Sequence, residues 1–292
     1  MYSIGENLNV INKGIGRAFK EMDPKPIREM AESIAAAQVD FIDINLGPAR
    51  KGGEELMTFV VKTVQEVTDI PLALDTSNIA AIEAGLKVHK GRALINSIMA
   101  RPERYTAMLP LVKQYDAMMI ALLWGPEGLP RDENERGALA AELTYAANEA
   151  GVANEDIFVD PIITPVNIQQ QQLMSTLTFM DMLQDIAPGC KSTCGLSNIS
   201  NGPPDHLRPI LNQTYMIMLE RHGMYSCILD AFDSKILDIA KGRRPDIVEL
   251  VHKVEDGAAI DLGSLSKEMQ DYVKTAKVIL GQSLFSDSWL EV

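Results

Sequence analysis

Short runs of apolar and β-branched residues alternate along this chain with longer stretches in which apolar residues recur every three or four positions. The short runs predict eight strands, at Tyr2–Ile4, Asp40–Ile44, Pro71–Leu74, Ala93–Ile95, Ala117–Leu123, Ile157–Val159, Ser192–Leu196 and Ser226–Leu229. The stretches between them predict helices, at Pro26–Gln38, Gly53–Val67, Ile79–Val88, Pro102–Tyr115, Glu133–Ala150, Gln169–Ile186 and Leu207–His222. A repeated strand–helix order makes neighbouring strands parallel. Eight such units within 292 residues suit a closed barrel better than an open doubly wound sheet, so we predict an α/β fold, a (β/α)8 TIM barrel.

The chain contains no low-complexity tract and no linker rich in proline and glycine that would divide it. We therefore predict a single domain over residues 1–292. The segment 241–270 is highly charged, and we expect it to form additional surface helices after the eighth strand.

The composition is that of an ordinary globular chain, with 46% hydrophobic and 23% charged residues. A formal net charge of −13 opposes broad attraction to nucleic acid or to an anionic membrane surface, so we expect neither as a partner. No apolar run approaches the roughly 18 residues that a membrane-spanning helix needs. The three cysteines form no even-numbered disulfide framework and suit a reducing compartment, so we expect a cytoplasmic protein.

Asp, Asn or Glu stands at or just after the end of nearly every predicted strand. These residues are Glu6, Asn7, Asn9, Asp43, Asn45, Asp75, Asn96, Asp160, Asn198 and Asp230. At a single position such a residue is as easily explained as a turn former or a helix N-cap. As a set they predict a pocket, because the carboxyl ends of all strands of a barrel open on one face.

The predicted pocket contains carboxylates and amides, no histidine, and hardly any lysine or arginine. Phosphate binding favours basic groups or a Gly-rich loop, and neither Gly14-Ile15-Gly16 nor Gly52-Gly53 completes a nucleotide-binding fingerprint. We interpret these glycines as turns. A carboxylate among amides instead suits a ring with an amidine edge, such as a pterin with its 2-amino group and N3–H.

We predict no metal site in this chain, because a zinc ion needs roughly three or four Cys, His or carboxylate ligands. Cys190 and Cys194 would supply two, and the sequence offers no paired histidines. No Gly-x-Ser-x-Gly nucleophile motif and no Asp-x-His-x-x-Gly corrinoid-binding motif are present.

Six blocks of the sequence carry a family resemblance. They are Ile4-Gly5-Glu6-Asn7 with Asn9, Asp43-Ile44-Asn45-Leu46-Gly47-Pro48, Leu74-Asp75-Thr76-Ser77-Asn78, Ile95-Asn96-Ser97, Val159-Asp160-Pro161 and Gly195-Leu196-Ser197-Asn198-Ile199-Ser200. In order and spacing they resemble the methyltetrahydrofolate:corrinoid protein methyltransferases, which share a pterin-binding fold with the folate domain of cobalamin-dependent methionine synthase. The resemblance therefore implies a (β/α)8 TIM barrel of the pterin-binding type.

The resemblance also implies which residues form the floor of the pocket. Asp75, Asn96 and Asp160 would form hydrogen bonds with the pterin ring. Asp43 and Asn45 would complete the floor beside them.

A second group of residues would surround N5 of the folate, again by resemblance. Asn198 would lie beside N5 as the catalytic residue, and Gly195 and Ser197 would shape the same loop. Arg208 resembles the family arginine that follows this loop and contacts the folate or supports Asn198. Here the sequence departs from the family pattern, because Gly202-Pro203-Pro204 makes the connection from Asn198 to Arg208 slightly longer.

These features together predict a methyltransferase that moves a methyl group between N5 of tetrahydrofolate and the cobalt of a separate corrinoid protein. Tetrahydrofolate and 5-methyltetrahydrofolate would be substrates, and the cobalamin would arrive on the partner protein. Both directions of transfer are open. A neutral Asn198 would act by a hydrogen bond to N5 that strengthens as charge develops there.

The sequence leaves two alternative functions open. One is an enzyme similar to dihydropteroate synthase, although that chemistry needs basic residues for a diphosphate leaving group where this chain has Gly195-Leu196-Ser197-Asn198. The other is a non-catalytic pterin- or folate-binding protein. The relatives further imply a homodimer, and segment 241–270 resembles a helical insertion that could select a particular partner.

Overall fold

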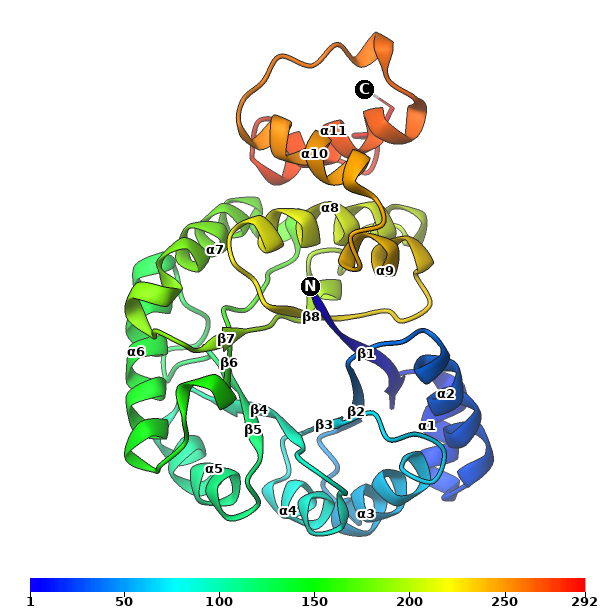
Figure 1. Cartoon of the computed structure of the whole chain (residues 1–292), viewed down its shortest axis with the longest axis vertical. Coiled ribbons are helices and arrows are strands. Elements are labelled where there is room, and N and C mark those ends of the chain that lie inside the picture. Colours follow the sequence, from blue (N-terminus) through cyan, green and yellow to red (C-terminus); the bar gives the residue numbers. More distant parts are fainter. Residues whose placement is uncertain (292) are drawn as a thin grey trace.

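The computed structural model describes residues 1–291, in which eight parallel strands form a nearly closed barrel (Figure 1). The strands are β1 Tyr2–Asn9, β2 Phe41–Gly47, β3 Leu72–Thr76, β4 Leu94–Met99, β5 Met118–Leu122, β6 Ile157–Asp160, β7 Lys191–Ser192 and β8 Ser226–Leu229. They pair in the order β7-β6-β5-β4-β3-β2-β1-β8. This arrangement confirms the predicted (β/α)8 fold.

Helices cover the outside of the barrel, where they bury the outward-facing side chains of the strands (Figure 1). The helices are α1 Lys13–Glu21, α2 Pro24–Ala36, α3 Gly53–Val64, α4 Ile79–Val88, α5 Pro102–Gln114, α6 Glu133–Glu149, α7 Val166–Ile186, α8 Arg208–Arg221, α9 Ser234–Ala240, α10 Pro245–Glu255 and α11 Lys267–Ile279. Short 3-10 helices are η1 Asn154–Asp156, η2 Leu196–Asn198, η3 Asp205–Leu207 and η4 Leu262–Ser264. Helices α2 to α8 correspond to the seven predicted helices.

Helix α1 corrects one expectation, because Gly14 and Gly16 lie inside it rather than in a turn. The Asn12 side chain caps the helix by accepting hydrogen bonds from the amides of Gly14 at 2.9 Å and Ile15 at 3.2 Å. A Cβ atom at Gly16 would lie 2.4 Å from the carbonyl oxygen of Val10. Glycine at this position therefore allows a close backbone approach, a reason that the sequence pattern does not reveal.

The seventh strand is shorter than the predicted Ser192–Leu196. After β7 the chain turns into η2, where the amide of Asn198 donates to the carbonyl of Gly195 at 3.2 Å. Only a single bridge, Gly195 to Ile228, joins this segment to β8, together with a bond of 2.8 Å from the Ile228 amide to the Cys194 carbonyl. The barrel is thus closed least tightly between β7 and β8.

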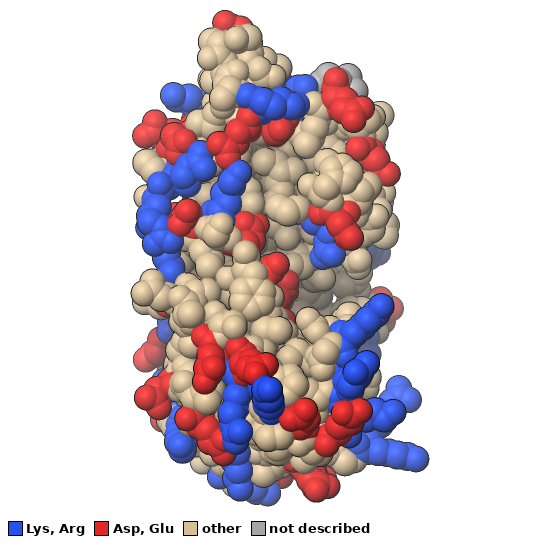
Figure 2. Space-filling model, turned by 90° about the vertical axis from the view of Figure 1, so that its right-hand side faces the viewer, with Lys and Arg blue, Asp and Glu red and all other residues tan. Residues whose placement is uncertain are grey.

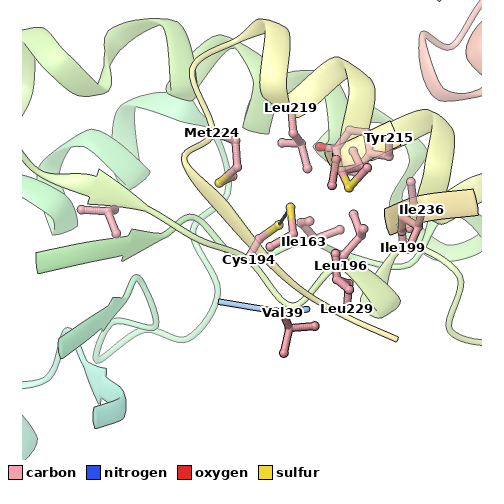
Figure 3. Packing of buried hydrophobic residues seen from close by; sticks show 14 of the residues in the cluster. Val39, Ile163, Cys194, Leu196, Ile199, Tyr215, Leu219, Met224, Leu229 and Ile236 are labelled. Carbon is pink, nitrogen blue, oxygen red and sulfur yellow. Dashed lines mark hydrogen bonds between the residues drawn. The ribbon is translucent and has the colours of Figure 1, made fainter. Parts of the chain in front are cut away.

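Side chains fill the layer behind this β7–β8 seam. Cys194 and Cys227 are buried and free, and their sulfur atoms lie 3.5 Å apart. Cys194 lies in a cluster with Leu196 and with Tyr215 and Leu219 from α8 (Figure 3). Apolar packing therefore supports the seam where backbone hydrogen bonds are few.

A second, smaller apolar cluster fills the inside of the barrel. It consists of Ile4, Ala73, Leu94, Ile120, Phe158 and Ile228, one from each of six strands. Phe41, Met118 and Tyr225 pack against this cluster. The barrel interior is consequently solid below the carboxyl ends of the strands, so a pocket can open only above this layer.

The C-terminal helices form an outer layer beyond α8 (Figure 1). A buried hydrogen bond of 2.6 Å from the Tyr272 hydroxyl on α11 to the Gln213 side chain on α8 ties the layers together. Helix α10 lies within the charged segment 241–270. On the side shown in Figure 2, acidic and basic side chains are mixed, with uncharged surface between them. No helix within residues 1–291 has both the length and the apolar character needed to cross a membrane.

Candidate functional site

Polar side chains form a layer directly above the apolar interior of the barrel. Successive side chains of a strand point to opposite faces, so a residue two positions after an inward-facing one also points inward. The apolar residues at positions 4, 73, 94, 158 and 228 are followed at this spacing by Glu6, Asp75, Asn96, Asp160 and Asp230. The pleat of the strands thus places carboxyl and amide groups at the mouth of the barrel.

Strands β2, β3 and β4 hold two carboxyl–amide pairs side by side. The amide nitrogen of Asn96 donates to Asp43 at 2.9 Å, and both side chains are buried. The amide nitrogen of Asn45 donates to Asp75, and the Asn45 oxygen accepts from the Gly47 amide at 2.9 Å. The structure therefore brings together four of the predicted floor residues.

Burial perturbs the ionisation of these two carboxyl groups. It raises the pKa of Asp43 well above the ordinary value, the nearby Asp75 raises it further, and the bond from Asn96 lowers it. Burial also raises the pKa of Asp75 to about 7. At neutral pH the pair therefore carries less than two full negative charges, and a ligand that donates hydrogen bonds would favour the ionised forms.

Asp160 completes the floor at the end of β6. Its carboxyl oxygen accepts a hydrogen bond of 2.8 Å from the Ile162 amide, and Ile162 has the unusual φ of +63°. Burial raises the pKa of Asp160 to about 7, while hydrogen bonds from the amides of Ile162 and Gly195 lower it. The Gly195 amide therefore lies near the Asp160 carboxyl group, on the loop that carries η2.

A cavity of about 270 Å³ opens beside this floor, at the ends of β1 and β8 and the start of α8. It is lined by Glu6, Ser197, Asp205, Arg208, Pro209, Asn212, Asp230, Asp233 and Ile236. Among the described residues, the buried side-chain oxygen of Asn212 has no hydrogen-bond partner. This oxygen is enclosed in the wall of the cavity, where its capacity to accept a hydrogen bond is unused.

Glu6 lies between the cavity and the loop after β7. The Ser197 hydroxyl donates to its carboxyl group at 2.5 Å. Burial raises the pKa of Glu6; the bond from Ser197 lowers it, Asp230 raises it, and Arg208 lowers it. The sequence places Glu6 among the strand-end residues that predict a pocket, but it assigns no role to Glu6 and gives no indication of Asn212. For Glu6 the signal was present, since it follows an inward-facing residue of β1 by two positions.

The remaining predicted residues lie around η2. Asn198 is exposed there, and a Cβ atom at Gly195 would lie 3.0 Å from the Asn198 amide nitrogen. A larger side chain at position 195 would therefore displace Asn198. The Nε of Arg208 donates to the Ser200 hydroxyl at 3.4 Å, which places its guanidinium at the cavity rather than against Asn198.

No three His, Cys, Asp or Glu side chains are grouped within residues 1–291 so that they could hold a metal ion. The site as a whole is a concave, acidic and amide-rich surface at the mouth of a barrel. Such a surface can accept hydrogen bonds from the edge of a polar ring.

Residues 5–227 match the family model described as pterin binding enzyme, and the chain therefore belongs to this family. Its sequence is similar to that of a methylcorrinoid:tetrahydrofolate methyltransferase from Eubacterium limosum, with 26% identity over 232 residues, 79% of this chain and 85% of the relative. It is also 26% identical over 245 residues to methionine synthase from Mycobacterium tuberculosis, covering 80% of this chain and 20% of that protein. These relatives confirm the resemblance seen in the sequence blocks.

Solved structures with the same fold include two dihydropteroate synthases. The enzyme from Xanthomonas albilineans with 4-aminobenzoic acid has a TM-score of 0.64 and 17% identity, covering 84% of this chain and 92% of its own. The enzyme from Thermus thermophilus has a TM-score of 0.61 and 18% identity, covering 84% and 93%. At these identities the likeness defines the fold alone, which is a pterin-binding type of barrel.

Proposed function

We propose that this enzyme transfers a methyl group between N5 of a tetrahydrofolate and the cobalt of a corrinoid carried by a separate protein. The observation that carries the proposal is the layer formed by Asp43, Asn45, Asp75, Asn96 and Asp160. Its carboxyl groups match the 2-amino and N3–H donors of a pterin, and its amides match the remaining ring positions. The methylcorrinoid:tetrahydrofolate methyltransferase relative supports the choice of reaction.

In this proposal the chemistry takes place at the other side of the pocket, near Asn198. The corrinoid of the partner supplies the cobalt that accepts or donates the methyl group. When the methyl group leaves N5 for the cobalt, the N–C bonding electron pair stays on nitrogen, and N5 ends the reaction with a proton taken up from solvent. In the reverse direction the N5 lone pair attacks the methyl group and that proton is lost. Asn198 would hold N5 by a hydrogen bond throughout and stabilise the charge that changes there.

A spectroscopic assay tests this function directly. The purified chain should bind 5-methyltetrahydrofolate and transfer its methyl group to free cobalamin reduced to the Co(I) state, which changes the cobalamin absorption spectrum. Binding without transfer would instead indicate a non-catalytic folate-binding protein. Condensation of 4-aminobenzoic acid with a dihydropterin diphosphate would indicate the dihydropteroate synthase alternative.

Replacing Asp160 with Ala should weaken pterin affinity by roughly 1.5–3 kcal/mol, because it removes a charged acceptor from a desolvated ring edge. Isothermal titration calorimetry measures the change. Asp156→Ala is the matched control. Asp156 immediately precedes the first residue of β6, at the end of the strand opposite to Asp160, and it pairs with Arg92. Unchanged affinity in the Asp160 variant would remove Asp160 from the site.

Exposed apolar side chains around the barrel mouth support a protein partner. They are Val10, Ile11, Trp124, Leu129, Ile168 and Phe232, all of which follow the carboxyl ends of strands. Exposed apolar surface beside a polar pocket is typical of a protein-binding site. We propose that the corrinoid protein covers this rim, which would bring the cobalt to N5 without a corrinoid site in this chain.

Replacing Ile11 with Asp should slow transfer with a protein-bound corrinoid by about tenfold or more, because a charge in the centre of an apolar contact must be desolvated. Transfer with free cobalamin should be unchanged, since the pocket is intact. Leu284→Asp is the control, because Leu284 is 87% exposed in the C-terminal segment, comparable with 84% for Ile11. Equal effects of the Ile11 substitution on both acceptors would argue against docking at the rim.

Three further expectations belong to this proposal. A homodimer is testable by size-exclusion chromatography with light scattering, and a cytoplasmic location by cell fractionation. A single cooperative unfolding transition would support one domain over residues 1–292.

A further inference from the structure

Arg136 is a buried charge that the proposed reaction does not use. It lies in the first turns of α6, outside the barrel, and only 1% of its surface is exposed. No carboxylate of residues 1–291 lies within 4.0 Å of its guanidinium. Burying an unpaired guanidinium is costly, because desolvation penalises the charged form, and burial accordingly lowers the pKa of Arg136.

Three neutral oxygen atoms compensate this burial. The Nε of Arg136 donates to the carbonyl of Pro161 at 2.9 Å. Its two terminal nitrogens donate to the hydroxyl of Ser175 and to the side-chain oxygen of Gln172, each at 3.0 Å. Ser175 in turn donates to Glu133 at 2.8 Å. Residues of α7 thus fix the plane of the guanidinium. In this orientation its Nε–H points at the Pro161 carbonyl.

That carbonyl belongs to the turn that presents Asp160. The turn needs support, because a β-branched residue such as Ile162 at a φ of +63° costs roughly 1–2 kcal/mol. The Asp160 side chain holds the turn from the pocket side by accepting from the Ile162 amide at 2.8 Å. Arg136 holds the same turn from the helix side through Pro161. The carboxyl group and the guanidinium therefore secure one backbone segment from opposite faces.

We propose that Arg136 is a positioning residue for pterin recognition, which fixes the Asp160 carboxyl group toward the pocket by holding the Pro161 carbonyl. The proposal rests on the pterin-binding site proposed above. Arg136 touches neither the Asp160 side chain nor the pocket, so it acts through the turn alone. A carboxyl group that must meet a ring edge at hydrogen-bonding distance is sensitive to small shifts of its backbone.

The test is a set of affinities for 6-hydroxymethylpterin, measured by calorimetry well below the unfolding temperature of each variant. Arg136→Met keeps the apolar volume and removes all three hydrogen bonds, and should weaken binding by about tenfold or more. Arg136→Lys can keep one donor at the Pro161 carbonyl and should fall between wild type and Arg136→Met. Leu143→Ala, also buried on α6, lowers stability without touching the turn and should bind with wild-type affinity.

A double-mutant cycle separates positioning from a general structural role. If Arg136 acts through Asp160, then in the Asp160→Asn background Arg136→Met should cost at most about a further twofold. Independent, additive losses would overturn the proposal, as would a folded Arg136→Met variant with wild-type affinity.

A second variant covers the case in which Arg136→Met does not fold. Removing two of the guanidinium's partners with Gln172→Ala and Ser175→Ala leaves Arg136 in place but free to move, and should weaken binding by about threefold or more. Wild-type affinity in this variant would overturn the proposal. Failure of the wild-type chain itself to bind the pterin would refute the proposed function and the role of Arg136 together, whereas wild-type binding with insensitive variants would refute the role of Arg136 alone.

Discussion

Replacing Asn198 with Ala is expected to slow methyl transfer by about 10²- to 10³-fold, which corresponds to roughly 2–4 kcal/mol of activation free energy. Its proposed contact is to N5, the one ring atom whose charge changes during the reaction. Pterin affinity should fall much less, because in the proposed binding mode Asp75, Asn96 and Asp160 would still hold the opposite edge of the ring. The loss should therefore appear in the rate constant rather than in the dissociation constant.

Single-turnover transfer to Co(I) cobalamin at saturating 5-methyltetrahydrofolate measures this rate, and binding is determined separately on the same variant. Asn201→Ala is the control, because Asn201 is exposed a few residues further along the same loop. If transfer proceeds at the wild-type rate while the dissociation constant rises, Asn198 binds the ring, and activation of N5 must come from another group.

Replacing Asp75 with Asn is expected to stabilise the empty protein above neutral pH while it weakens pterin binding. Burial raises the pKa of Asp75 in the folded protein to about 7. Ionising this carboxyl group near neutral pH therefore costs more free energy in the folded protein than in the unfolded chain. Wild-type stability from this group is therefore complete at acid pH and is lost as the pH rises toward 7. Asn has no proton to lose and also relieves the repulsion that Asp75 exerts on Asp43.

Urea unfolding of both proteins at pH values of about 5 and 8 gives the comparison. Near pH 5 the variant should be more stable by a smaller margin, since the carboxyl group is already ionised in the unfolded wild type while it is still protonated in the folded one, and the margin should grow until the pH passes about 7. Near pH 8 the variant should be more stable by roughly 1–3 kcal/mol, given about 1.4 kcal/mol for each unit of pKa shift and the partial exposure of the side chain. If the difference in unfolding free energy does not depend on pH, then ionisation of Asp75 does not lower the stability of the folded protein.

The floor of the candidate site could be predicted from the sequence because it follows from strand periodicity. Asp43, Asn45, Asp75, Asn96 and Asp160 stand at or just after the ends of the predicted strands, and parallel strands in a barrel end on the same face. The pairing of Asp43 with Asn96 could not be predicted, since it depends on how β2 and β4 project into the interior. The family resemblance predicts a role for each position, without the geometry that connects them.

Other features depend on contacts between segments far apart in the chain. Gly16 looks like a turn former in the sequence, but it lies in helix α1. A glycine is needed there because the Val10 carbonyl leaves no room for a side chain. The seventh strand ends early because η2 takes up the backbone groups that would have extended it. Arg136 lies in an otherwise ordinary helical pattern, and nothing in that pattern indicates that it holds the turn after Asp160.

The uneven closure of the barrel divides the candidate site into two parts that differ in how many backbone hydrogen bonds hold them. Strands β2 to β6, joined by ladders on both sides, carry all five floor residues. The loop with Ser197 and Asn198 follows β7, and a single bridge, from Gly195 to Ile228, pairs this segment with β8. In the proposed function, the strands with continuous backbone pairing would therefore hold the pterin ring, and the segment with the least backbone pairing would carry Asn198, the residue proposed to contact N5 as its bonding changes.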